Sequence, residues 1–200
     1  MLENKLGLTS SAELHDAEER LTKQRAAQLF ADRLLDGKPA GAFQTLAFIH
    51  EHLFQDVYPF AGEVRKVDIS KGGFRFASAL YLEGALKSIE GMPQADFDQI
   101  IKKYVEMNVA HPFREGNGRS MRLWLDHILK EELGQVVDWS RVDKQDYLLA
   151  MERSPVKDTE IRVLIEDALT PEVDDRDIFM KGIDASYAYE GYETYRTATL

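Results

Sequence analysis

Hydrophobic residues recur three and four positions apart along most of the chain, which is the spacing of an α-helix with one buried face. The first run opens after Ser10, which stands three residues before Glu13 in a capping-box pattern. We expect this helix to continue to about Leu35 and to stop at Gly37. Further helices are predicted at about 41–54, 79–92, 97–110, 121–134, 143–153 and 159–169.

The period changes in "EVRKVDISKGGFRF", residues 63–76. This stretch has β-branched residues before a Gly-Gly pair and aromatic residues after it: Val64, Val67, Ile69, Phe74 and Phe76. Two extended runs around Gly72-Gly73 predict a β-hairpin, whose edge could pair with an extended segment of a partner. The predicted fold class is therefore all-α, a helical bundle with one small β-hairpin.

Composition and charge exclude several classes of protein. The 200 residues fit one domain, and 44% hydrophobic with 30% charged residues is typical of a soluble globular protein. The absence of cysteine excludes disulfides and thiolate metal sites, and a net charge of -10 argues against direct nucleic-acid binding. The N-terminus lacks a signal-peptide pattern and no apolar stretch is long enough to span a membrane. We therefore expect a cytoplasmic protein with no membrane contact.

Two histidines, His50 and His52, flank Glu51 in the second predicted helix. Side chains two positions apart on a helix point about 200° apart, so these two cannot chelate one metal ion. The HExxH pattern is also absent. No metal site is predicted here.

The segment "HPFREGNGRSMR", residues 111–122, carries most of the candidate chemistry. It lies between two predicted helices, so Gly116-Asn117-Gly118 would place free N–H groups at a helix N-terminus, where anions bind. Arg119 and Arg122 could hold phosphates, Glu115 could bind Mg²⁺, and His111 could accept a proton near neutral pH. Taken singly, each is also common as a cap, a turn or surface charge. Together they are the parts that phosphoryl or nucleotidyl transfer needs.

The stretch from His111 through Arg122 matches HPF-x-[D/E]-GN-[G/K]-R-x-x-R, and in this it resembles the Fic family. The resemblance implies the Fic fold and transfer of AMP from ATP to a protein hydroxyl, with release of pyrophosphate. His111 would be the general base for a target Ser, Thr or Tyr, and Glu115 would hold Mg²⁺. The backbone of 116–118 and the Asn117 side chain would form an anion hole. Arg119 would contact the β-phosphate region and Arg122 the γ-phosphate.

In the same family the hairpin, at about 63–77, is a flap that docks the target, which implies docking roles for Val67, Ile69, Phe74 and Phe76. The sequence does not identify the target protein. By analogy alone, a subunit of a type II topoisomerase is one candidate partner.

The C-terminal stretch "SYAYEG", residues 186–191, offers a second clue. From the residues alone it is a terminal helix that packs tyrosines on the core, with Glu190 in solvent and Gly191 inside the helix. It also resembles [S/T]-x-x-x-E-[G/N], the inhibitory motif of self-inhibited Fic proteins. That resemblance implies a Fic domain at 1–180 and an autoinhibitory helix at 181–200, in which Glu190 pairs with Arg122 and Ser186 tethers the helix.

Several finer expectations follow from the resemblance. With His111 in the same pocket, Glu190 could orient a water for removal of AMP, under Mg²⁺ or Ca²⁺ at Glu115. Tyr187 and Tyr189 are candidates for self-modification, and homo-oligomers are possible. The alternatives are a transferase of another nucleotide or of phosphocholine, a kinase, or a nucleotide-sensing binding module. Gly118 favours AMP transfer, because the kinase branch carries lysine at this position.

Overall fold

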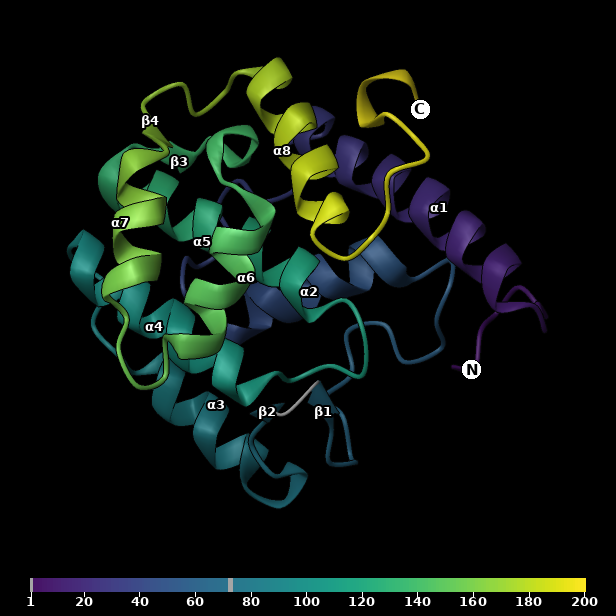
Figure 1. Ribbon diagram of the computed structural model, residues 1–200, viewed down its shortest axis with the longest axis horizontal. Helices are drawn as coiled ribbons and strands as arrows, with labels where there is room; N and C mark the ends of the chain where they lie inside the picture. Colours follow the sequence, from purple (N-terminus) through teal and green to yellow (C-terminus); the bar gives the residue numbers. More distant parts are fainter. Residues whose placement is uncertain (1, 72–73) are drawn as a thin grey trace.

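The computed structural model describes residues 2–71 and 74–200, and most of the chain is helical (Figure 1). Its α-helices are α1 Ser11–Ala31, α2 Phe43–Phe54, α3 Leu82–Glu90, α4 Phe97–Ala110, α5 Asn117–Leu133, α6 Lys144–Arg153, α7 Thr159–Asp167 and α8 Arg176–Ala188. Short 3-10 helices lie at Ala79–Tyr81, Trp139–Arg141 and Thr197–Thr199. Among the helices of these residues, none is long and apolar enough to cross a bilayer.

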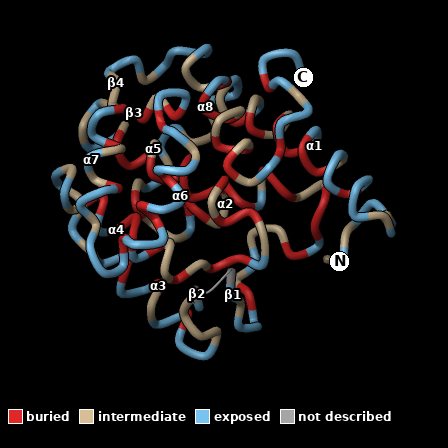
Figure 2. The backbone as a smooth tube through the Cα atoms, in the orientation of Figure 1, coloured by how far each residue is buried: buried red, intermediate tan, exposed pale blue. Residues whose placement is uncertain are grey.

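Helix α5 forms the middle of the bundle and packs against α2, α4 and α8. Its residues Trp124, Leu125 and Ile128 are fully buried, and the Trp124 indole N–H donates to the carbonyl of Ala42 at 3.1 Å. Buried backbone is concentrated where α2 and α5 pass through the centre, while the outer loops are exposed (Figure 2). The loop that precedes α5 therefore ends on a rigid element.

Two short antiparallel sheets complete the fold. Strands β1 Ser70–Lys71 and β2 Phe74–Arg75 form the predicted hairpin, with Ser70 opposite Arg75. The strands are shorter than the sequence suggested, and the predicted Gly72-Gly73 turn lies outside the described residues. A second sheet, β3 Val136–Val137 with β4 Leu169–Thr170, was not predicted, because strands of two residues carry no readable period.

Helix α1 begins as predicted but ends early. Ser10 Oγ accepts a hydrogen bond from the Glu13 N–H at 3.4 Å, which is the expected N-cap. The helix ends at Ala31 rather than near Leu35, because Arg33 adopts a left-handed conformation with φ of 50°. Leu35 still packs against the core, so the hydrophobic period continues beyond the helix.

The C-terminal helix also differs from the predicted span of 181–200. Helix α8 starts at Arg176, where Asp175 caps it by accepting from the Ile178 N–H at 2.9 Å, and it ends at Ala188. The remaining segment reverses direction and runs beside α1 (Figure 1). Gly191 causes the reversal with φ of 90°, so it terminates the helix instead of lying inside it.

Candidate active site

The loop between α4 and α5 has two residues in the left-handed conformation. His111 ends α4 with φ 49° and ψ 64°, and Gly116 caps α5 with φ 74° and ψ 9°. A Cβ at Gly116 would also lie 2.3 Å from the Phe54 ring, so glycine is required by backbone and by space. Helix α5 thus begins at Asn117, earlier than the predicted start near Met121, and residues 116–118 lie at its N-terminus as expected.

The Asn117 side chain holds the loop closed. Its Oδ1 accepts from the Phe113 N–H at 2.8 Å, and its Nδ2 donates to the Phe113 carbonyl at 2.8 Å. The side chain is buried, with 3% of its surface exposed. This side chain therefore shapes the loop, and its part in an anion hole stays a prediction.

His50 supports the same loop from α2. Its Nδ1 accepts from the Gly62 N–H at 2.8 Å, so its Nε2 carries the proton and donates to the Glu115 carbonyl at 2.9 Å. The ring is buried and stacks on Phe113 with centroids 3.8 Å apart, and burial lowers the pKa of His50 to about 3. The imidazole is neutral at physiological pH. The sequence excluded a metal here but did not reveal this supporting role.

His111 has the tautomer that a general base requires. Its Nδ1 lies 3.2 Å from the Asn108 carbonyl, which can only accept, so Nδ1 carries the proton and Nε2 is the basic nitrogen. The Phe76 ring from the hairpin stacks on the imidazole, with centroids 3.7 Å apart and planes at 17°. The hairpin and the candidate base are therefore in direct contact.

An open cleft gathers most of the predicted site residues. Its lining comes from the hairpin, from α4, from the loop between α4 and α5, from α5 and α6, and from the tail after α8. The lining residues are Ile69, Ser70, Phe76, Tyr104, Asn108, His111, Arg114, Glu115, Gly116, Asn117, Gly118, Arg122, Lys144, Tyr147, Leu148, Met151, Glu152, Tyr189, Glu190 and Gly191. Two of the predicted docking residues, Ile69 and Phe76, take part. Val67 does not line this cleft. Its side chain is 48% exposed and, with Leu80, lines a different hollow. The side chain of Phe74 lies outside what the structure describes.

Arg122 connects the cleft to α8. Its Nε donates to Ser186 Oγ at 2.6 Å, and its Nη2 donates to the Ser186 carbonyl at 2.8 Å. The same Nη2 lies 3.4 Å from Glu190 Oε1, an ion pair in which the Arg122 side chain is 3% exposed and that of Glu190 is 18% exposed. Burial opposes the charge of Arg122, but Tyr147 and Glu190 outweigh it and raise the guanidinium pKa. The predicted pairing of Glu190 with Arg122 is thus present in the structure.

The Glu190 carboxylate also lies against the first turn of α5. A Cβ at Gly118 would be 2.6 Å from Glu190 Oε1 and 3.0 Å from an Arg122 nitrogen, so a larger residue would require the ends of these two side chains to shift. Glu190 follows the end of α8 instead of lying on its face, and no atom of the described residues lies within 4 Å of a Cβ built on Gly191. The positive φ of Gly191 is therefore the reason for glycine at this position.

Arg119 points away from the cleft, contrary to its predicted contact with the β-phosphate region. It is 1% exposed, and its Nη2 lies 2.7 Å from Glu18 Oε1 on α1 and 3.2 Å from Glu115 Oε1. Three aromatic rings lie 4.6–5.2 Å from the guanidinium carbon: Phe54, Tyr187 and Tyr192. Among the described residues its Nε and Nη1 have no hydrogen-bond acceptor, so ring contacts take that place. Arg119 therefore connects the loop before α5 with α1 and with the C-terminal tail.

Two buried tyrosines lie between Ser186 and Glu190 in the chain. Tyr187 is 1% exposed and Tyr189 is 5% exposed, and the Tyr189 hydroxyl donates to the Val142 carbonyl at 2.8 Å. Burial raises the pKa of Tyr187 to about 12. Both hydroxyls would have to leave the core before self-modification, which stays a prediction.

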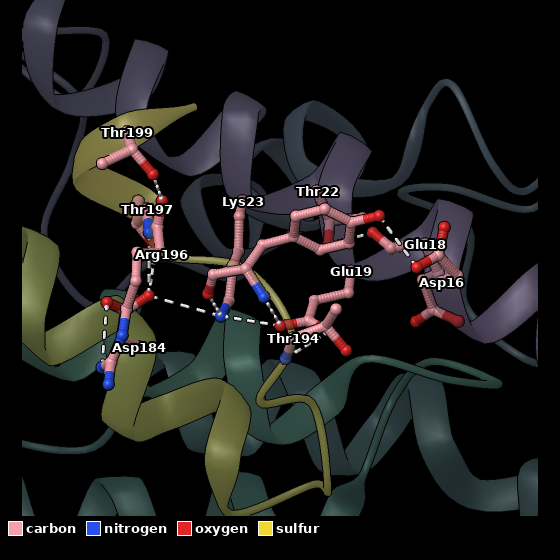
Figure 3. Close-up of polar contacts among 11 residues, drawn as sticks. Asp16, Glu18, Glu19, Thr22, Lys23, Asp184, Thr194, Arg196, Thr197 and Thr199 are labelled. Atoms are coloured by element: carbon pink, nitrogen blue, oxygen red, sulfur yellow. Dashed lines mark hydrogen bonds and ion pairs between the residues drawn. The ribbon is translucent and has the colours of Figure 1, made fainter.

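The tail after Glu190 is fixed to α1 by buried polar contacts (Figure 3). The Glu19 carboxylate accepts the backbone N–H groups of residues 194 and 195 at 3.1 and 3.0 Å. Lys23 Nζ lies 2.9 Å from Glu19, donates to the carbonyl of residue 195 at 2.7 Å and lies 3.3 Å from Asp184. Asp184 on α8 accepts the Thr197 N–H at 3.0 Å. These contacts determine where the chain leaves Glu190.

Glu115 is the one metal-ligand candidate from the sequence. Its side chain is 41% exposed, and its Oε1 accepts from the Gly116 N–H at 2.9 Å. The described residues contain no group of three His, Cys, Asp or Glu placed to hold a metal ion. A single carboxylate fits Mg²⁺ that takes its other ligands from substrate phosphates and water, and it does not make a protein cage for Ca²⁺.

The fold and the cleft define a class: helical proteins that place a phosphate-bearing ligand at a helix N-terminus beside a basic histidine. The sequence model of the Fic/DOC family matches residues 42–129. The "Probable protein adenylyltransferase Fic" of Escherichia coli (strain K12) is 30% identical over 72% of this chain and 75% of its own length. The chain therefore belongs to the Fic/DOC family, which confirms the resemblance and the predicted fold class.

Two further comparisons agree. The protein adenylyltransferase VbhT of Bartonella schoenbuchensis is 33% identical over 72% of this chain, a segment that is 31% of VbhT. The crystal structure of BepC from Bartonella tribocorum, with bound AMPPNP, has the same fold with a TM-score of 0.72 and 21% identity, over 86% of this chain and 93% of that one.

Proposed function

We propose that this protein is an adenylyltransferase that transfers AMP from ATP to a Ser, Thr or Tyr hydroxyl of a protein target. The observation that carries the proposal is the meeting, in one cleft, of the His111 imidazole, the N-terminus of α5 at 116–118 and the Arg122 guanidinium. Relatives named protein adenylyltransferase, and AMPPNP bound in BepC, support the same donor.

The chemistry follows from these groups. His111 Nε2 accepts the proton of the target hydroxyl, and the hydroxyl oxygen attacks the α-phosphorus. The bond from that phosphorus to the oxygen bridging the β-phosphate breaks, and pyrophosphate leaves. Backbone N–H groups at 116–118 stabilise the charge that develops on the α-phosphate, and Arg122 holds the terminal phosphate. Mg²⁺ bound through Glu115 would neutralise phosphate charge.

We also propose that the protein is self-inhibited by Glu190. Its carboxylate lies 3.4 Å from Arg122 and against Gly118, the positions that the terminal phosphate would occupy. Ser186 accepts a hydrogen bond from the Nε of the same guanidinium. ATP that binds beside this carboxylate would have its α-phosphate displaced, and a displacement of about 1 Å can cost ~100-fold in rate.

A second activity, removal of AMP, is favoured by His111 and Glu190 lining the same cleft. Glu190 would orient a water that attacks the phosphorus of an AMP-modified side chain. The bond from phosphorus to the side-chain oxygen breaks, and protonated His111 donates its proton to that oxygen. In this reaction the carboxylate that blocks transfer would act as the base.

The hairpin is proposed to dock the target. Ile69 and Phe76 line the cleft, and Phe76 contacts His111 directly. Strand addition at β1 or β2 would bring an extended segment of the target past the imidazole. Such pairing uses mainly backbone groups, so it selects an extended segment more than a sequence.

The test uses ATP labelled at the α-phosphate, with Mg²⁺, on the wild type and on the Glu190→Gly and His111→Ala variants. AMP transfer predicts covalent label on Glu190→Gly, little on the wild type, and none on His111→Ala, whether alone or combined with Glu190→Gly. ATP labelled at the γ-phosphate separates the alternatives, because label from it would identify a kinase. Binding of ATP without label from either position would favour a nucleotide sensor.

A further inference from the structure

Arg65 is a buried cation at the base of the hairpin, with 3% of its surface exposed. Among the described residues, its guanidinium donates to four backbone carbonyls. Nε donates to His111 at 2.8 Å, and Nη2 donates to Ala110 at 3.1 Å and to Ala77 at 2.5 Å. Nη1 donates to Val67 at 2.7 Å. One side chain therefore holds both sides of the hairpin and the end of α4.

Two of these acceptors, Ala110 and His111, lie at the C-terminus of α4. The last carbonyls of a helix receive no hydrogen bond from within the helix. A cation is favoured there because the helix dipole is negative at this end. The Arg65 backbone adds a bond from its N–H to the Pro112 carbonyl at 2.8 Å. Arg65 thus stabilises the peptide groups on both sides of the His111 Cα.

The conformation of His111 makes this support significant. A residue other than glycine at φ 49° and ψ 64° is strained by roughly 1–2 kcal/mol, and it persists only where its surroundings hold it. On the other side, the hairpin returns to α4 through the Ala77 N–H, which donates to the Val109 carbonyl at 3.0 Å. The adjacent Phe76 ring is thereby placed on the His111 imidazole.

We propose that Arg65 is a positioning residue for the AMP-transfer reaction: it fixes the hairpin and His111 as one unit, so that the docked target hydroxyl meets the base. Lysine cannot replace it, because a single ammonium lacks the planar fork that spreads donors over carbonyls on three segments. This proposal rests on the proposed function for its effect on rate. Its structural part is testable without activity.

The experiment compares Arg65→Lys with Arg153→Lys, which changes an exposed arginine at the C-terminus of α6 that pairs with Glu160 on α7. The first readout is the NMR shift of the His111 ring protons, which the stacked Phe76 ring moves upfield. Arg65→Lys should lose this ring-current shift, and Arg153→Lys should keep it. Calorimetry should give unchanged ATP affinity for both, since Arg65 does not line the phosphate end of the cleft.

In the Glu190→Gly background, Arg65→Lys should lower self-labelling from α-labelled ATP by about 10- to 100-fold, as expected for a misplaced reacting group. If Glu190→Gly itself takes no label, the proposed function fails, and the ring-current readout still decides the role of Arg65. An Arg65→Lys variant that keeps both the His111 shifts and the labelling rate overturns the proposal.

If Arg65→Lys does not fold, hydrogen exchange of the wild type gives the answer. The proposal predicts that the N–H groups of Arg65 and Ala77 exchange slowly and together, although neither lies in a helix or a strand. Exchange at the rate of the exposed hairpin backbone would contradict it.

Discussion

The Oε1 atom of Glu190 lies 3.4 Å from Nη2 of Arg122, and the two residues are 68 positions apart in the chain. The carboxylate therefore neutralises the cation that faces the N-terminus of α5. If Glu190 inhibits, Glu190→Gly should increase AMP transfer by about 10- to 100-fold, since the donor then aligns correctly. Label from α-labelled ATP at saturating concentration measures the change.

The matched control for this prediction is Glu193→Gly, which removes an exposed carboxylate three residues further along the same tail. It should leave the rate unchanged. Equal rates for wild type, Glu190→Gly and Glu193→Gly would rule out inhibition by Glu190.

Lys23→Met should release the tail from α1. Removing one member of a buried ion pair costs about 3–5 kcal/mol, because Glu19 and Asp184 would be left without their cation. We expect the free energy of unfolding to fall while AMP transfer rises toward the Glu190→Gly level. Urea unfolding and the labelling assay measure the two quantities.

An increase in activity distinguishes tail release from general damage, which would only lower the rate. Lys181→Met, which removes an exposed lysine on α8, should change neither quantity. A less stable Lys23→Met protein with unchanged transfer would mean that the tail anchor has no part in inhibition.

Gly116→Ala should lower the free energy of unfolding by about 2–4 kcal/mol, through a strained positive φ and through overpacking against Phe54. Gly134→Ala is the matched control, because Gly134 has φ of 64° but no described atom within 4 Å of a new Cβ. It should cost only the backbone part, about 1 kcal/mol. Denaturant titrations compare them. Equal losses of unfolding free energy in the two variants would show that the contact with Phe54 does not contribute.

His50 should make the protein less stable in mild acid. Its pKa is about 3 in the folded state against 6.5 for the free side chain, so the unfolded state binds more protons between these values. Stability falls by ~1.4 kcal/mol for each pH unit below 6.5. His50→Gln keeps a donor for Glu115 and an acceptor for Gly62 but does not titrate.

Between pH 6.5 and 5, the wild type should therefore lose about 2 kcal/mol more than His50→Gln. Urea unfolding at both pH values measures this difference, in which the other titrating groups cancel. Parallel losses in the two proteins would mean that His50 is not buried in its neutral form.

The sequence was sufficient for the local features of the site. Helical periodicity, Pro112 and the glycines of 116–118 placed a helix end, a loop and a helix start in the right order. These features depend on residues close in the chain, whose backbone preferences act without tertiary contacts. The family motif then assigned His111 and the pairing of Glu190 with Arg122.

Tertiary structure alone decided where Arg119 points. It stands three residues from Arg122 on the same helix, yet its guanidinium turns toward Glu18 and the rings of Tyr187 and Tyr192. A local pattern cannot distinguish the two arginines, because the groups that bind the first come from opposite ends of the chain.

The supporting roles of His50 and Arg65 were equally hidden in the sequence. His50 reaches the Glu115 carbonyl across 65 positions, and Arg65 reaches the His111 carbonyl across 46. Every residue has a backbone carbonyl, so the acceptor of such a bond can be any residue type. The sequence therefore contains no partner residue that would reveal the bond. Local sequence was enough for the order of helix, loop and helix around residues 111–122, because backbone preferences depend on neighbours in the chain. Which side chains hold that loop, and which of the two arginines of α5 lines the cleft, depends on packing that brings distant segments together.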